Sequence, residues 1–209
     1  MIKIAITGKA DKRILAYPLM RACSIAGRTC VFTDDPAYKR LYAGTENQGE
    51  IEGIKLHILP LMTEENMREI EELAAGNETE YLIFISDTFY PKSAGHILML
   101  CEYNNTFLGD RIEDIIDEQD NVTFGMLTLI PQKSKALIPK DVQLHQVVWK
   151  AEYSFYLFQT EEMRKLMPLK DKAVSALLVN AFANILDIKP ASFYDLLKRK
   201  RYIYSKKDN

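Results

Sequence analysis

Three aspartates follow apolar segments of the chain and are the first candidates for chemistry. Asp34 and Asp35 come directly after the β-branched and aromatic run 29–33, and Asp87 follows the most apolar run, 80–86. If both runs are parallel strands, the carboxylates lie at the carboxyl ends of the strands, where α/β proteins place ligands. Carboxylate oxygens suit Mg²⁺. The turn chemistry of Asp-Asp-Pro explains the first pair equally well, so both interpretations stay open.

Other reactive side chains show no catalytic or metal-binding spacing. The histidines are His57, His96 and His145, and none stands at a metal-ligand distance from another histidine or a cysteine. Ser86 and Ser93 lack the Gly-x-Ser-x-Gly context of a nucleophile elbow. We therefore predict no metal site built on histidine or cysteine and no acyl-transfer triad.

The cysteines indicate the redox environment in which the protein works. Cys23, Cys30 and Cys101 are odd in number and lack the close pairs of a zinc site or a redox motif, so we expect buried thiols in a reducing compartment. The apolar start of the chain is interrupted by Lys3, and no apolar run reaches the ~20 residues of a membrane span. These features predict a cytoplasmic protein.

Length and charge limit the organisation. A chain of 209 residues suits one large domain. Its formal net charge is −2, so any contact with nucleic acid or an anionic membrane must come from a local patch. We expect an α/β domain over residues 1–190 and a basic tail over residues 191–209.

The alternation of patterns along the chain predicts the elements that must position these residues. Strands are expected over 2–7, 29–33, 54–59, 80–86 and 121–130, and helices over 12–26, 63–76, 93–103, 110–119 and 170–187. The stretch 132–168 receives no assignment, because prolines interrupt it and its residues 144–158 carry aromatic side chains in either strand or helix spacing. This order predicts an α/β fold: a doubly wound, mostly parallel sheet with helices on both faces.

The segment Lys-Ile-Ala-Ile-Thr-Gly-Lys, residues 3–9, resembles the opening of the MinD/ParA family of P-loop ATPases. That family continues as Gly-Lys-Gly-Gly-x-Gly-Lys-Ser/Thr. Gly27, the run 29–33 with its Asp-Asp-Pro ending, and Asp87 resemble the glycine, the second strand and the acidic residue that follow in the family. The resemblance covers roughly the first 90 residues well and the remainder only by the order of elements.

The loop itself departs from the family pattern. A working P-loop needs glycines whose N–H groups wrap the phosphates, a lysine for the β/γ oxygens and a hydroxyl for Mg²⁺. This loop, Gly-Lys-Ala-Asp-Lys-Arg over residues 8–13, is about two residues short if Gly27 sets the alignment. Lys12 then takes the place of the P-loop lysine, Arg13 replaces the hydroxyl, and Asp11 puts a negative charge where phosphate would sit.

Two further residues follow from the same resemblance. Lys9 matches the family's signature lysine, which crosses a dimer, although a lysine after a strand is more often simply exposed to solvent. Pro18 disfavours helix at Tyr17, so we expect the helix that faces the phosphate to begin late or to be kinked. The resemblance thus implies a vestigial nucleotide site made of Gly8, Lys9, Lys12, Asp35 and Asp87.

The end of the chain forms a separate basic segment. Lys198, Arg199, Lys200 and Arg201 precede a short aromatic run. Basic residues interleaved with aromatic ones can bind an anionic membrane or a nucleic acid. A solvated terminus is the alternative.

We predict from these features a non-hydrolysing MinD/ParA-like scaffold or regulator that dimerises and docks a protein partner in a larger bacterial assembly. No bound cofactor is expected. The first alternative is a divergent ATPase that still binds ATP and Mg²⁺ weakly. The second is a membrane-surface or nucleic-acid adaptor that uses the basic tail.

Overall fold

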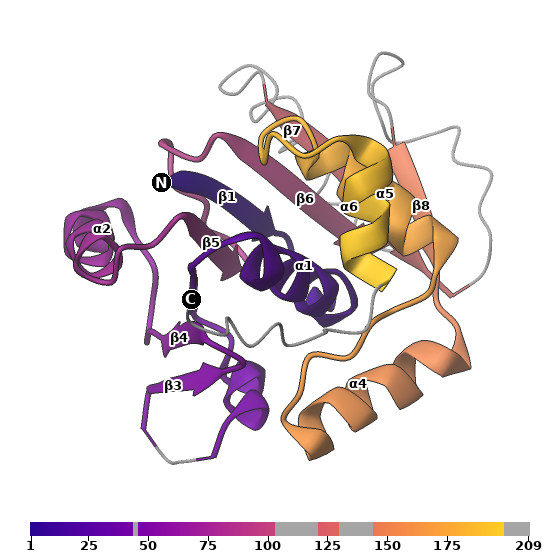
Figure 1. Cartoon of the computed structure of the whole chain (residues 1–209), viewed down its shortest axis with the longest axis horizontal. Coiled ribbons are helices and arrows are strands. Elements are labelled where there is room, and N and C mark those ends of the chain that lie inside the picture. Colours follow the sequence, from indigo (N-terminus) through magenta and orange to yellow (C-terminus); the bar gives the residue numbers. More distant parts are fainter. Residues whose placement is uncertain (44–45, 103–120, 130–143, 199–209) are drawn as a thin grey trace, which may run out of the picture.

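The computed structural model describes residues 1–43, 46–102, 121–129 and 144–198 (Figure 1). Within these ranges eight strands form one sheet in the order β3-β4-β2-β5-β1-β6-β7-β8. The strands are β1 (Ile2–Thr7), β2 (Thr29–Thr33), β3 (Gln48–Ile51), β4 (Ile54–Ile58), β5 (Tyr81–Ser86), β6 (His96–Glu102), β7 (Val122–Thr128) and β8 (Leu144–Val148).

The sheet is mostly parallel, as predicted. Only β3, paired with β4 at the edge, runs antiparallel to its neighbour within the described chain. The first strand lies in the middle, because β1 pairs with β5 on one side and with β6 on the other. The carboxyl end of β1, where the loop of residues 8–13 begins, is therefore flanked by strands on both sides.

Helices cover both faces of the sheet (Figure 1). The helices are α1 (Arg13–Ala26), α2 (Met67–Gly76), α4 (Ala151–Met163), α5 (Lys172–Phe182) and α6 (Pro190–Lys198), with short 3-10 turns η1 (Pro36–Leu41) and η2 (Glu64–Asn66). Side chains alternate along β1, so Ile4 and Ile6 pack with α1 on one face and Ala5 packs with α2 on the other. The predicted α/β class is confirmed.

The segment 93–103 was expected to be a helix, and that prediction is wrong. Residues 96–102 form the strand β6 between β1 and β7. Ile97 and Leu98 are both 0% exposed, although successive side chains of a strand point to opposite faces. A strand buried on both faces has a continuous apolar run rather than an alternating one, and the Leu and Met of this run also suit a helix. The expected helix 110–119 lies outside the described residues.

Helix α1 begins directly after the loop, not late. It begins at Arg13 and contains Pro18. Proline has no N–H to donate to the carbonyl of Ile14, one turn earlier, which costs the helix a hydrogen bond. Every residue from 14 to 23 is buried, so tertiary packing outweighs this local cost.

The segment 144–158, left unassigned from the sequence, changes structure in its middle. Residues 144–148 form the edge strand β8, and α4 begins at Ala151. Tyr153, Tyr156 and Leu157 are buried on one side of α4, whereas Phe155 and Phe158 are both 61% exposed. Aromatic residues on both sides of one helix explain why its sequence shows no clear helical period.

The start of the expected tail belongs to the core. Residues 190–198 form α6, in which Phe193 is 0% and Leu197 1% exposed. Arg21 of α1, itself 1% exposed, donates from Nη1 to the carbonyl oxygen of Leu196 at 2.8 Å. Helix α6 is therefore part of the folded domain. Among the expected tail contacts, only Lys198 is described, and Arg199, Lys200 and Arg201 lie outside the described residues.

In the described part of the chain, no helix combines the length and the apolarity needed to span a membrane.

We expect Phe193→Ala to lower the free energy of unfolding by about 3–5 kcal/mol, because it leaves a cavity where α6 packs against α1 and α5. The matched control is Phe158→Ala, which removes the same ring from an exposed helix position and should change stability by about 0.5 kcal/mol or less. Urea unfolding followed by circular dichroism measures both. Equal effects of the two substitutions would contradict the packing of α6.

Candidate functional site

The candidate site is the loop that joins β1 to α1. Its first residue, Gly8, has φ +108°, in the region that favours glycine. A Cβ placed on it would lie 1.9 Å from the carbonyl oxygen of Leu100 in β6. The Gly8 N–H donates to the carbonyl oxygen of Asp87 at 3.2 Å, which ties the loop to the end of β5. The loop therefore turns at the end of β1, between β5 and β6, at a position where no side chain fits.

Lys12 turns inward and is held by the loop. Its Nζ donates to the carbonyl oxygens of Gly8 at 2.7 Å and Ala10 at 3.2 Å and to Oδ1 of Asp87 at 2.5 Å. These acceptors match the three N–H donors of the ammonium group. The Lys12 side chain is 2% exposed and that of Asp87 is 62% exposed. The structure therefore brings together three of the predicted residues, Gly8, Lys12 and Asp87.

Asp11 occupies the N-terminal end of α1. Its carboxylate accepts hydrogen bonds from the backbone N–H of Arg13 at 3.1 Å, from Nε of Arg13 at 3.0 Å and from Nη2 at 2.8 Å. Burial raises the pKa of the Asp11 carboxyl, but the hydrogen bonds and positive charge of Arg13 outweigh burial, so the pKa lies below its usual 3.8. A helix N-terminus attracts anions, and at the start of α1 that anion is the Asp11 carboxylate.

Glu161 of α4 holds the other side of the Arg13 guanidinium. Its Oε1 accepts from Nη1 of Arg13 at 2.8 Å and from the Tyr17 hydroxyl at 3.0 Å. Its Oε2 accepts from Nη1 of Arg40 at 3.4 Å. Burial raises the pKa of Tyr17, and the charge of Glu161 adds to this, so the hydroxyl remains a donor. This carboxylate connects the loop and η1 to α4.

Sequence reasoning missed Glu161 because it is 148 residues from Arg13 and lies in the unassigned segment. No short-range spacing connects the two residues. The available signal was chemical: an Arg in place of the Mg²⁺-binding hydroxyl needs a carboxylate partner when it is partly buried.

The remaining aspartates have separate partners. Asp35 accepts from the N–H of Ala37 at 2.8 Å and caps η1, as the turn interpretation requires. Asp34 accepts from the Ser86 hydroxyl at 2.7 Å. Lys9 is exposed. Over the described ranges, no group of three His, Cys, Asp or Glu residues is arranged to hold a metal ion.

We expect Gly8→Ala to cost more stability than Gly53→Ala. Both glycines have positive φ, but a Cβ on Gly53 meets nothing within 4 Å, whereas a Cβ on Gly8 meets the β6 backbone. Gly53→Ala should cost about 1–3 kcal/mol from backbone strain alone. Gly8→Ala should exceed this clearly or fail to fold, because β6 must move. Urea unfolding of both variants measures the difference, and equal costs would contradict the close approach of the loop to β6.

The comparisons with known proteins concern the fold. No family model matches the sequence, and no curated protein matches it. The chain is similar to the solved structure of the MinD cell division protein of Aquifex aeolicus, with a TM-score of 0.55 and 11% identity over 85% of this chain and 94% of that one. It is also similar to the structure of the MinC:MinD cell division protein complex of Aquifex aeolicus, with a TM-score of 0.57, 12% identity and coverage of 97% and 100%. At such low identity the likeness shows a MinD-like fold.

Proposed function

We propose that the chain is a non-hydrolysing, MinD-like scaffold or regulatory protein that docks a protein partner. One observation carries the proposal. The groups of the loop that would serve a phosphate are already bound by the chain's own side chains: Lys12 by the loop and Asp87, and Arg13 by Asp11 and Glu161.

Electrostatics argues against a nucleotide in this loop. Near a protein surface, two like charges 4 Å apart repel by about 4 kcal/mol at an effective dielectric constant of about 20. A phosphate beside Asp11 meets that repulsion unless the carboxylate moves, and Lys12 must also leave three acceptors to reach it. In addition, Arg13 offers no hydroxyl for Mg²⁺. These costs act on binding before any hydrolysis begins.

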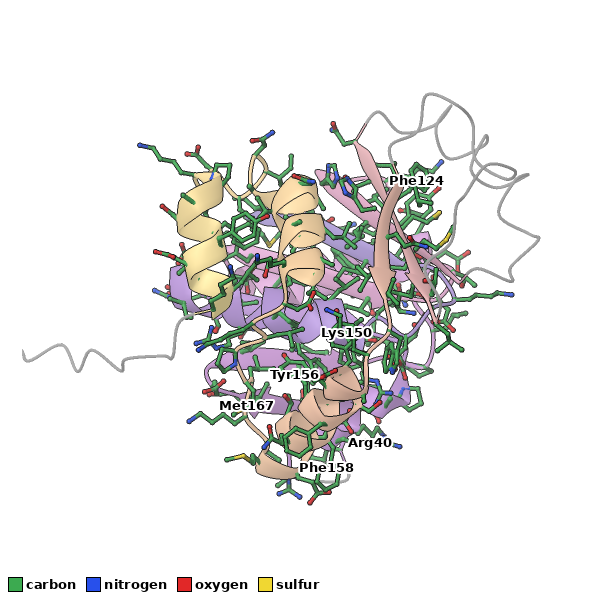
Figure 2. The ribbon with its side chains drawn as sticks, turned by 90° about the vertical axis from the view of Figure 1, so that its right-hand side faces the viewer. Arg40, Phe124, Lys150, Tyr156, Phe158 and Met167 are labelled. Atoms are coloured by element: carbon green, nitrogen blue, oxygen red, sulfur yellow. The ribbon has the colours of Figure 1, made fainter. Side chains whose placement is uncertain are left out.

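Two observations support partner docking. The structure of a MinC:MinD complex is among those with a similar fold, so a fold of this kind forms a protein complex in that case. In this chain, α4 carries Phe155, Phe158 and Met163, each about 60% exposed. Figure 2 shows Phe158 and Arg40 at the lower end of the molecule. Exposed aromatic residues are enriched at protein interfaces.

The second candidate is a divergent ATPase. It is favoured by Lys12, which remains inside the loop beside Asp87, at the carboxyl ends of β1 and β5. From the sequence alone we also propose homodimerisation, a cytoplasmic location and binding through the basic tail.

Calorimetry with Mg-ATP tests the proposed function. We expect no saturable heat at 1 mM ATP, which corresponds to a binding free energy weaker than about −4 kcal/mol. Micromolar binding that is lost in Lys12→Met but kept in Lys170→Met would contradict the proposal and favour the ATPase. The exposed Lys170 is the matched control, because its replacement removes the same charge from a position outside the loop.

A further inference from the structure

We propose that Asp11 and Glu161 form an autoinhibitory plug, in which two carboxylates of the chain bind Arg13 and the start of α1 in place of a phosphate-type anion. The inference rests on the proposed function, in which the loop is not a catalytic site. It goes further by naming the two side chains that prevent an anion from binding the loop, where the sequence pointed only to the missing glycines.

The geometry at Arg13 carries the first step. Asp11 bonds Nε and Nη2 on one edge of the guanidinium as well as the backbone N–H at the start of α1. Glu161 bonds Nη1 on the other edge. A guanidinium binds carboxylate and phosphate groups with the same fork of donors, so a carboxylate in that fork competes directly with phosphate.

The second step concerns α4. The Glu161 side chain is only 11% exposed, and its oxygens are shared by two arginines and the Tyr17 hydroxyl. The same carboxylate that neutralises Arg13 therefore anchors α4 to α1 and η1. The occupant of the Arg13 guanidinium is therefore linked to the position of α4, the helix that carries the exposed Phe155 and Phe158.

A buried hydroxyl gives an independent observation. Tyr38 of η1 is 0% exposed, and its OH has no hydrogen-bond partner among the described residues. Its ring packs edge-on against Tyr17, with ring centroids 5.6 Å apart, and Tyr17 itself donates to Glu161. An unsatisfied buried donor is costly. This one interacts electrostatically with Asp11 and Arg13, so an anion that replaced the Asp11 carboxylate would enter the surroundings of an unpartnered donor.

Sodium pyrophosphate without Mg²⁺ is the probe, and calorimetry is the readout. We compare the natural chain with Asp11→Asn, with Glu161→Gln and with the double variant. The matched control is Glu162→Gln, which removes one negative charge from the neighbouring, exposed position of α4. We expect no saturable binding at 1 mM by the natural chain or by the control. The double variant should bind pyrophosphate at least tenfold more tightly than the natural chain, and adding Arg13→Leu should reverse the gain.

A second readout follows α4. Hydrogen exchange of α4 amides should be faster in Glu161→Gln than in Glu162→Gln, because only the first loses the anchor. If the double variant is unfolded at the temperature of the calorimetry, the single variant Asp11→Asn is the test. It keeps the Glu161 contacts, and the plug predicts that it already binds pyrophosphate more tightly than the natural chain.

The outcomes separate the two proposals. A folded double variant that gains no binding overturns the plug and leaves the proposed function intact. A natural chain that already binds pyrophosphate as tightly as the variants also overturns the plug. Micromolar ATP binding by the natural chain, tested separately above, overturns the proposed function itself.

Discussion

Arg13 holds one carboxylate on each edge of its guanidinium, and the arrangement of the candidate site depends on this contact. Asp11 comes from the loop and Glu161 from α4, so a single side chain fixes both the start of α1 and the position of α4. A partly buried arginine is stable only when its donors are paired. The contact therefore places two negative charges where the fold would otherwise offer a positive, anion-attracting end.

The rest of the fold constrains the loop but does not determine what it binds. Because β1 is central, the backbone of β6 forces Gly8 to be glycine and the loop to turn sharply. The chain therefore has the strand, the turn and the helix of a MinD-like fold, and the side chains in the turn decide what that turn can bind. Function is determined by those side chains and not by the fold alone.

Much of the fold follows from the sequence because its signals are local. The strands over 2–7, 29–33 and 80–86 and the helix after the loop are set by short runs and by glycines. Strand β6 was misassigned because a strand buried on both faces has no alternation to detect. Residues 191–198 of α6 were assigned to a tail because the basic residues at their end were given more weight than Phe193 and Leu197, which are buried.

The site was predictable where its contacts are close in sequence and where the family resemblance pointed to Asp87. The negative charge of Asp11 at the start of the helix could be anticipated, since Asp11 and Arg13 are two residues apart. Asp87, 75 residues from Lys12, was named in advance only because of the resemblance, whereas the Glu161 contact, at a separation of 148 residues, needs the tertiary fold. The pairing of Ser86 with Asp34 is of the same kind, because it joins the ends of two strands that are adjacent only in the sheet.

The pKa of the Asp11 carboxyl tests most directly whether Arg13 holds this carboxylate, and carbon-13 NMR titration measures it. Because the folded chain favours the charged form, the pKa should lie below 3.8. The corresponding stability should be complete above about pH 4 and disappear as the pH falls through the lowered pKa. In Arg13→Leu the pKa should rise, since the hydrogen bonds and charge of Arg13 are lost and only the charge of Lys12 still opposes burial. A pKa at or above 3.8 in the natural chain would contradict the claim that the loop is closed by its own charges.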